Sequence, residues 1–155
     1  MDKRINTLQK RTKGDMICSF VAALAAVGIA VKEFWAYIST DGIYPEHLTN
    51  GIYAIFAFGI TLILGLILLE VHKIGKPFSK RIINELRVLA MFVILGGIIA
   101  PIIQDMVNGT SSEISVELVM SAKNVIVSII GVVIGVVSEI FVYGYELQDD
   151  VDSIA

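Results

Sequence analysis

Four long apolar runs, separated by short polar connections, dominate the pattern of the chain. They extend over residues 16–31, 48–69, 88–104 and 124–138. An α-helix rises about 1.5 Å per residue, so roughly 17 to 25 residues cross the hydrocarbon core of a bilayer. The chain has room for four such crossings and no fifth. The predicted transmembrane helices cover about 16–38, 48–71, 87–105 and 123–143.

The connection between the second and third runs carries signals that end one helix and start another. Gly75 and Pro77 cannot continue the second helix, because proline breaks a helix and glycine weakens it. Ser79 is a preferred N-cap residue, so a new helix is expected to begin there. After Ser79, apolar residues at helical spacing alternate with charged ones such as Lys80 and Arg81. This pattern predicts amphipathic first turns at the membrane surface.

The connection between the third and fourth runs allows two interpretations. Thr110 and Glu113 have the spacing of a capping box, which predicts a short helix. Ile114, Val116 and Leu118 alternate with polar residues, as the residues of a strand do. Both interpretations stay open.

The composition supports a membrane protein and argues against a water-soluble domain. Hydrophobic residues make up 55% of the 155 residues, charged residues only 17%, and the mean hydropathy is +0.78. Ordinary globular domains are less apolar and more charged than this. The predicted fold class is therefore an all-α membrane protein, a bundle of four transmembrane helices.

The distribution of charge predicts the orientation of the bundle. Five of the twelve Lys and Arg residues precede the first helix, and five lie between the second and third. The remaining two, Lys32 and Lys123, accompany six acidic residues near the other two connections. By the positive-inside rule, both termini are cytoplasmic, N-in and C-in, in a multi-pass protein of the inner or plasma membrane. The domains are then a basic N-terminus (1–15), a transmembrane domain (16–145) and an acidic tail (146–155).

The first run also resembles a secretory signal, because a basic segment precedes it. However, the run continues through Lys32 and Glu33 into aromatic residues at 34–37, which suit a membrane interface. This continuation favours a transmembrane helix. Cys18, the only cysteine, lies inside the run and allows no disulfide framework within the chain.

Small residues at four-residue spacing predict where helices pack. In a bilayer, helices associate through close packing, because lipid tails are as apolar as leucine. Gly131 and Gly135 form a GxxxG pattern in the fourth helix, and the first helix has Ala22, Ala26 and Ala30. These faces are expected to lie against neighbouring helices, while association of two copies through the GxxxG face remains open.

Glu139 is the only charged residue between Asn124 and Tyr145. A charge at the centre of a membrane helix costs roughly 2.5 to 3.5 kcal/mol on insertion scales, so such a residue usually lies near an interface, meets a partner or does chemistry. The predicted topology puts Glu139 near the cytoplasmic end of its helix. We predict an ion pair of Glu139 with Arg87 or Lys73 that anchors this helix. A proton-carrying carboxylate in a transport path is the competing interpretation.

The sequence contains no recognisable catalytic or metal-binding pattern. His47 and His72 are expected on opposite sides of the membrane, and the chain has no HExxH and no glycine-rich phosphate loop. We therefore expect no enzyme activity, no catalytic residue, no metal site and no cofactor.

The last ten residues carry four acidic side chains and no basic one. These are Glu146, Asp149, Asp150 and Asp152. Acidic residues do not bind anionic lipid, so the tail is expected to project into the cytoplasm, where it could meet a basic surface. A solvated, frayed terminus is the simpler interpretation.

Two segments carry a resemblance to a known family. One is the loop Gly75-Lys76-Pro77-Phe78-Ser79 with Leu86 and Arg87, and the other is the ending from Phe141 to Ile154, which includes Tyr143-Gly144-Tyr145-Glu146-Leu147-Gln148-Asp149-Asp150. Together they resemble a bacterial membrane-protein family catalogued as domain of unknown function 2975. The resemblance implies a four-span inner-membrane protein, often encoded beside a small helix-turn-helix regulator of the Cro and repressor type.

The resemblance leads to a hypothesis about function: the protein is a membrane partner or sensor for such a cytosolic regulator. The expected interaction surface, shaped in part by Arg87, consists of Pro77, Phe78, Tyr143, Gly144, Glu146, Leu147, Gln148, Asp149, Asp150 and Asp152. Direct binding of nucleic acid is not expected, because an acidic tail repels phosphates. Two alternatives are a small permeation or immunity-type membrane protein and a structural subunit of a larger membrane complex.

Overall fold

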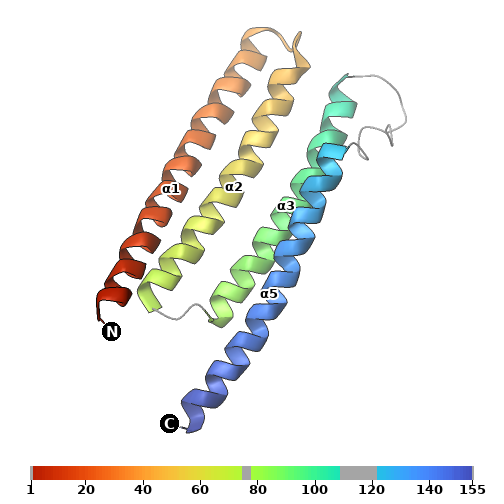
Figure 1. The fold of residues 1–155 in the computed structure, drawn as a ribbon. Helices are drawn as coiled ribbons and strands as arrows, with labels where there is room; N and C mark the ends of the chain where they lie inside the picture. The colour runs from red at the N-terminus through yellow and green to blue at the C-terminus, as the bar shows by residue number, and fades with distance from the viewer. Residues whose placement is uncertain (1, 75–77, 109–121, 155) are drawn as a thin grey trace.

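The computed structural model describes residues 2–74, 78–108 and 122–154, and these residues form four α-helices (Figure 1). The helices are α1 (Asp2–Ser39), α2 (Pro45–Ile74), α3 (Lys80–Asn108) and α5 (Ala122–Ile154). No strand occurs within these described ranges, and the predicted all-α, four-helix fold class is confirmed. The predicted turn at Gly75 and Pro77 and the segment 109–121, with its two interpretations, lie outside the described residues.

Each helix contains a stretch that is long and apolar enough to cross a bilayer. The stretches are Lys10–Ser39, Glu46–Lys73, Lys80–Val107 and Asn124–Val151. The protein is therefore a multi-pass integral membrane protein.

The helices are longer than the predicted membrane spans. α1 begins at Asp2 and α5 continues to Ile154, so the basic N-terminus and the acidic tail continue these two helices. Lys, Arg and Gln in the N-terminal segment are good helix formers. Extending an existing helix is much easier than starting one, so the Asp-rich tail can continue α5 as well. The tail is thus the helical end of α5 rather than a frayed terminus.

The four helices form two antiparallel hairpins. α1 packs along α2, α3 packs along α5, and the contact between α2 and α3 joins the hairpins (Figure 1). In the described part of the chain, no comparably extensive contact links α1 to α5. Both chain termini lie at the same end of the molecule as the last turn of α2 and the first turn of α3. We call this the terminal end, and the opposite one the loop end.

The buried core lies where α2, α3 and α5 meet. Its central residues are Ile67, Ile82, Leu89 and Val93. Ile134 and Phe141 of α5 pack against this cluster. α3 is therefore the central helix, with α2 on one side and α5 on the other.

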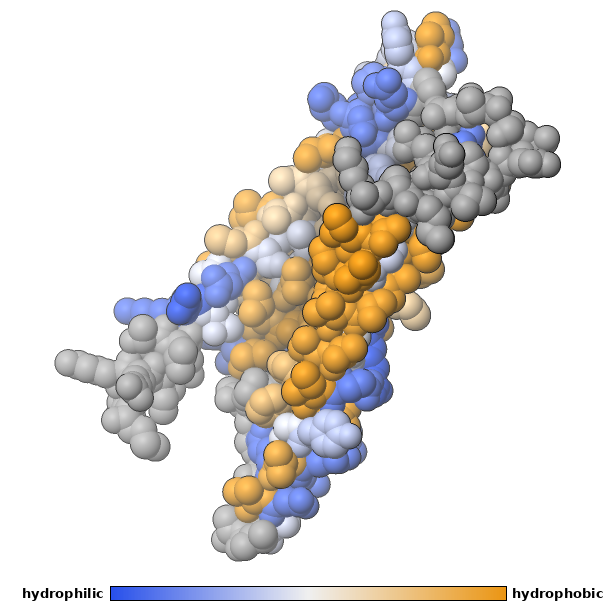
Figure 2. Space-filling view, turned by 45° about the vertical axis from the view of Figure 1, so that its right-hand side comes forward, coloured by the Kyte–Doolittle hydropathy of each residue, from blue (hydrophilic) through white to orange (hydrophobic). Residues whose placement is uncertain are grey.

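Most of the remaining helix surface is apolar and exposed. Figure 2 shows hydrophobic residues along the middle of the molecule and hydrophilic residues gathered towards its two ends. On α5, the exposed residues include Ile126, Ile130, Val133 and Ile140. A surface of this kind is stable in lipid and would aggregate in water.

The local signals in the sequence agree with the helix boundaries. The N–H of Ile82 donates to Oγ of Ser79 at 3.2 Å, so Ser79 caps α3 as predicted. Between α1 and α2 the chain turns at Asp41 and Gly42, whose φ values of 51° and 74° are left-handed, a conformation that suits Gly and Asp.

The buried face of α1 differs slightly from the predicted one. Ala26 and Ala30 are buried as expected, but Ala22 is exposed and Ala23 takes its place. An α-helix has 3.6 residues per turn, so a strict spacing of four drifts around its axis. Over eight residues this drift is large enough to move Ala22 off the contact face.

Candidate functional site

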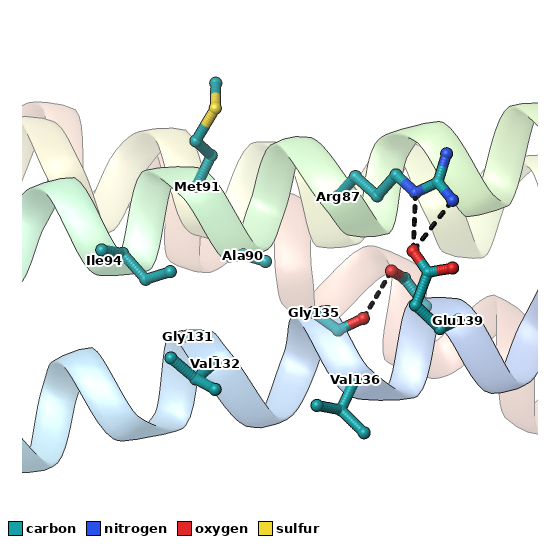
Figure 3. A pocket seen from close by; sticks show the side chains of 10 residues that line it. Arg87, Ala90, Met91, Ile94, Gly131, Val132, Gly135, Val136 and Glu139 are labelled. Atoms are coloured by element: carbon teal, nitrogen blue, oxygen red, sulfur yellow. Dashed lines mark hydrogen bonds and ion pairs between the residues drawn. The ribbon is translucent and has the colours of Figure 1, made fainter.

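Arg87 of α3 contacts Glu139 of α5, so the structure contains one of the two ion pairs that the sequence predicted (Figure 3). Nη2 of Arg87 donates to Oε1 of Glu139 at 2.8 Å, and Nε donates to the same oxygen at 3.2 Å. The two side chains are 50% and 61% exposed. Within the part of the chain that the structure describes, Oε2 of Glu139 has no hydrogen-bond partner. The pair thus lies on the surface of the bundle, accessible to other molecules.

The pair lies towards one end of the apolar part of both helices. Arg87 directly precedes the uncharged run of α3, and Glu139 is followed by six more uncharged residues, 140–145, before Glu146. The two helices are antiparallel, so both positions fall at one level, towards the terminal end (Figure 1). Charged side chains at this level can reach lipid headgroups and water.

An open groove of about 490 Å³ extends from the ion pair between α3 and α5. Its apolar walls are formed by Met91, Ile94, Val132 and Val136 (Figure 3). Gly131, Gly135 and Ala90 line it as well, and their small size leaves it open. The groove is therefore apolar along its length and charged at one end.

The two glycines of the predicted GxxxG pattern have different surroundings. A Cβ atom on Gly131 would lie 2.5 Å from Cγ1 of Ile94 and 3.1 Å from the carbonyl oxygen of Ala90. A Cβ atom on Gly135 would meet only Cβ of Ala90, at an ordinary 3.8 Å. Close packing of α3 and α5 thus requires glycine at 131, whereas at 135 the packing gives no reason for it.

At the terminal end, the start of α3 packs against the projecting part of α5. The rings of Phe78 and Phe141 meet edge to face, with their centroids 5.1 Å apart. A Cβ atom on Gly144 would lie 2.7 Å from the Phe78 ring, and Nζ of Lys80 lies 5.6 Å from the centre of the Tyr145 ring. The structure therefore brings together Phe78 and Gly144 of the predicted interaction surface. Pro77 lies outside the described residues.

Replacing Phe78 with alanine should loosen the end of α5. The change removes an aromatic pair and the contact with Gly144, together about 1–2 kcal/mol, so amide exchange at 145–150 should rise roughly tenfold. Hydrogen exchange in detergent micelles measures this, with Phe78→Leu as the control that keeps an apolar contact. Equal exchange in Phe78→Ala and the unchanged protein would show that the helix end does not depend on this contact.

The projecting end of α5 presents an exposed apolar stripe. Tyr143, Leu147 and Val151 are 70%, 67% and 65% exposed and follow one another every four residues, so they share one face of the helix. Glu146 and Asp150 are also exposed and lie along one side of this stripe. Sequence reasoning selected Tyr143 and Leu147 only through the family resemblance and missed Val151, although the four-residue spacing was a visible signal.

The other predicted surface residues in this segment are less informative. Asp149 is exposed and Gln148 is half-buried. The structure describes the backbone of Asp152, which is helical, but not the position of its side chain.

A second charged cluster, which sequence reasoning missed, joins α2 to α3. Nη1 of Arg81 lies 3.2 Å from Oε2 of Glu70, and its Nε lies 3.1 Å from Oε1 of Glu85. The carboxylates are only 13% and 17% exposed. Oε2 of Glu85 is buried without a hydrogen-bond partner in the described structure. Arg81 therefore offsets two mostly buried negative charges.

At the loop end, a smaller charged cluster joins α1 to α2. Nδ1 of His47 lies 2.7 Å from Oε2 of Glu33, and Nζ of Lys32 lies 3.5 Å from Oε1 of the same carboxylate. Glu33 is mostly buried, so its partners stabilise a charge that the bundle holds away from solvent. His72 belongs to the last turn of α2, at the terminal end, so the two histidines lie at opposite ends of this helix.

Neither a group of metal ligands in the described part of the chain nor similarity to known proteins indicates a function for this protein. No three His, Cys, Asp or Glu side chains among the described residues are placed to hold a metal ion. Comparison of the chain with family models, curated proteins and solved structures found no match. The resemblance to domain of unknown function 2975 therefore stays a prediction.

Proposed function

We propose that this integral membrane protein binds a small cytosolic helix-turn-helix regulator through the projecting end of α5. The observation that carries the proposal is the exposed stripe of Tyr143, Leu147 and Val151, bordered by Glu146 and Asp150. An amphipathic helix that docks in a groove of a partner uses apolar anchors at such spacing. The proposal rests on the cytoplasmic location of this end, which the distribution of Lys and Arg predicts.

The charges around the stripe favour a basic partner over the membrane surface. Anionic headgroups repel carboxylates, so Glu146, Asp149 and Asp150 keep this segment away from the bilayer. A DNA-binding regulator carries a basic face that contacts phosphates. Binding of the acidic helix to that face would compete with binding of DNA. Regulator bound to the membrane protein would therefore not occupy its operator.

Replacing Leu147 with serine should weaken binding of the regulator at least tenfold. A central apolar anchor in a docked helix commonly contributes about 2 kcal/mol or more, and tenfold corresponds to about 1.4 kcal/mol. The measurement is the affinity of the detergent-purified protein for a small helix-turn-helix regulator of the Cro and repressor type, the class of partner that the family resemblance implies. Ile43→Ser is the matched control, because Ile43 is equally exposed but lies at the loop end.

The same assay includes a competition with operator DNA, which should displace the protein from the regulator. If the regulator binds the unchanged protein and Leu147→Ser with equal affinity, the stripe is not the docking site. If it binds neither of them in detergent or in nanodiscs, the proposed partnership is wrong.

A further inference from the structure

The groove between α3 and α5 combines an apolar channel with two opposite charges at one end. Met91, Val132 and Val136, which line it, are each more than half exposed, so the groove opens onto the surface that faces lipid. Arg87 lies where the uncharged run of α3 begins, and Glu139 lies at the same level of α5. A long charged side chain such as that of Arg87 can extend from this level to the headgroups of a bilayer. A molecule that fits this groove has an apolar chain and a head with both charges.

Gly135 supports the idea that the groove itself is used. Glycine in a helix interior is unfavourable by roughly 1 kcal/mol relative to alanine. Gly131 has a packing reason for this, because its Cβ would clash with Ile94, but at Gly135 the nearest atom lies at 3.8 Å. The absence of a side chain at 135 instead leaves space in the groove next to the ion pair.

The geometry of the ion pair leaves one guanidinium donor and one carboxylate oxygen available to a ligand. Arg87 uses Nε and Nη2 for Glu139, and both bonds end on Oε1. Nη1 of Arg87 and Oε2 of Glu139 make no hydrogen bond with the described residues, and Figure 3 shows both atoms directed away from the contact. A free guanidinium donor suits a phosphate, and a free carboxylate oxygen suits an ammonium group.

We propose that this groove binds one phospholipid with a primary-amine headgroup, of the phosphatidylethanolamine class. An acyl chain lies along Met91, Val132 and Val136, the phosphate accepts hydrogen bonds from Arg87, and the ammonium group donates to Glu139. Phosphatidylglycerol carries the same phosphate but no cation, so it would satisfy Arg87 alone and leave Oε2 of Glu139 without an ammonium partner. A choline headgroup would place a cation there that has no N–H to donate.

The test compares three phospholipids that differ only in their headgroup. The protein is purified in detergent, stripped of lipid and titrated with dioleoyl phosphatidylethanolamine, phosphatidylcholine or phosphatidylglycerol, and native mass spectrometry counts the lipid retained. Phosphatidylethanolamine should bind roughly tenfold tighter than phosphatidylcholine, the effect of one charge-assisted hydrogen bond. Equal binding of all three lipids, or preference for phosphatidylglycerol, would overturn the assignment.

Two variants with matched controls locate the bound lipid. Glu139→Gln should bring phosphatidylethanolamine down to the level of phosphatidylcholine, whereas Glu46→Gln, at the loop end, should not. Gly135→Leu should reduce retention of every lipid by filling the groove. Gly28→Leu is its control, because no atom lies within 4 Å of the Cβ position at Gly28. Retention of the lipid by Gly135→Leu, or a mass that shows a second copy of the chain in place of lipid, would contradict the proposal.

Discussion

Replacing Gly131 with leucine should separate α3 from α5 and destabilise the bundle by about 3 kcal/mol, as overpacking of a close contact does. The first added carbon would already lie 2.5 Å from Cγ1 of Ile94 and 3.0 Å from its backbone nitrogen. The side chain of Ile94 can turn aside, but the backbone of α3 can make room only by moving as a whole. The whole interface of the second hairpin would therefore have to open.

Unfolding of the detergent-solubilised protein by increasing sodium dodecyl sulfate measures this loss. Gly135→Ala is the matched control at the next turn of the same helix, and its stability should stay within about 0.5 kcal/mol of the unchanged protein, or rise slightly. If Gly131→Leu and Gly135→Ala prove equally stable, α3 and α5 do not pack as closely as the structure shows.

Replacing Arg81 with alanine should destabilise the protein by about 2 kcal/mol, more than the same change at Arg87. The Arg81 side chain is 64% exposed, but its removal leaves the carboxylates of Glu70 and Glu85 mostly buried, close together and without their cation. Removing one partner from a buried charged cluster is strongly destabilising, because the remaining charge has lost both water and its counter-ion. Arg87 and Glu139 are half exposed, and exposed pairs contribute about 1 kcal/mol or less.

The same unfolding assay compares Arg81→Ala with Arg87→Ala. The double variant Glu70→Gln with Glu85→Gln, added to Arg81→Ala, should restore much of the stability, because neutral amides do not need the cation. Similar losses of stability for Arg81→Ala and Arg87→Ala would mean that burial of the carboxylates does not decide how much each ion pair contributes to stability. A small loss of stability for Arg87→Ala would agree with the proposal that this pair serves to bind lipid.

The sequence predicts the four helices well because long runs of apolar, uncharged residues directly indicate membrane-spanning helices. In lipid, a single apolar segment can satisfy all its backbone hydrogen bonds within itself only as a helix. The ends of the helices were less well predicted. Nothing in the charged residues after Tyr143 distinguishes a helix that continues in water from a frayed end, so the extension to Ile154 and the stripe through Val151 emerged only from the structure.

The charged contacts were predicted only as far as topology determines them. Antiparallel helices of known length put Glu139 at the level of Arg87, but they do not show that the pair is exposed. Arg81 lies one turn from Glu85, which was visible, whereas its contact with Glu70 depends on how α3 rotates against α2. In the same way, the spacing of Gly131 and Gly135 gives no sign that only one of them lies against a backbone.

The arrangement of the helices as two hairpins in series has a consequence for how the protein is made. The most extensive helix contacts, α1 with α2 and α3 with α5, lie within one hairpin each, whereas the contact of α2 with α3 that completes the core lies between them. Ribosomes deliver the first hairpin before the second exists, and it can settle in the bilayer without waiting for α5. Assembly then requires only that the two pre-formed hairpins meet along α2 and α3, a single step of lateral association within the plane of the membrane.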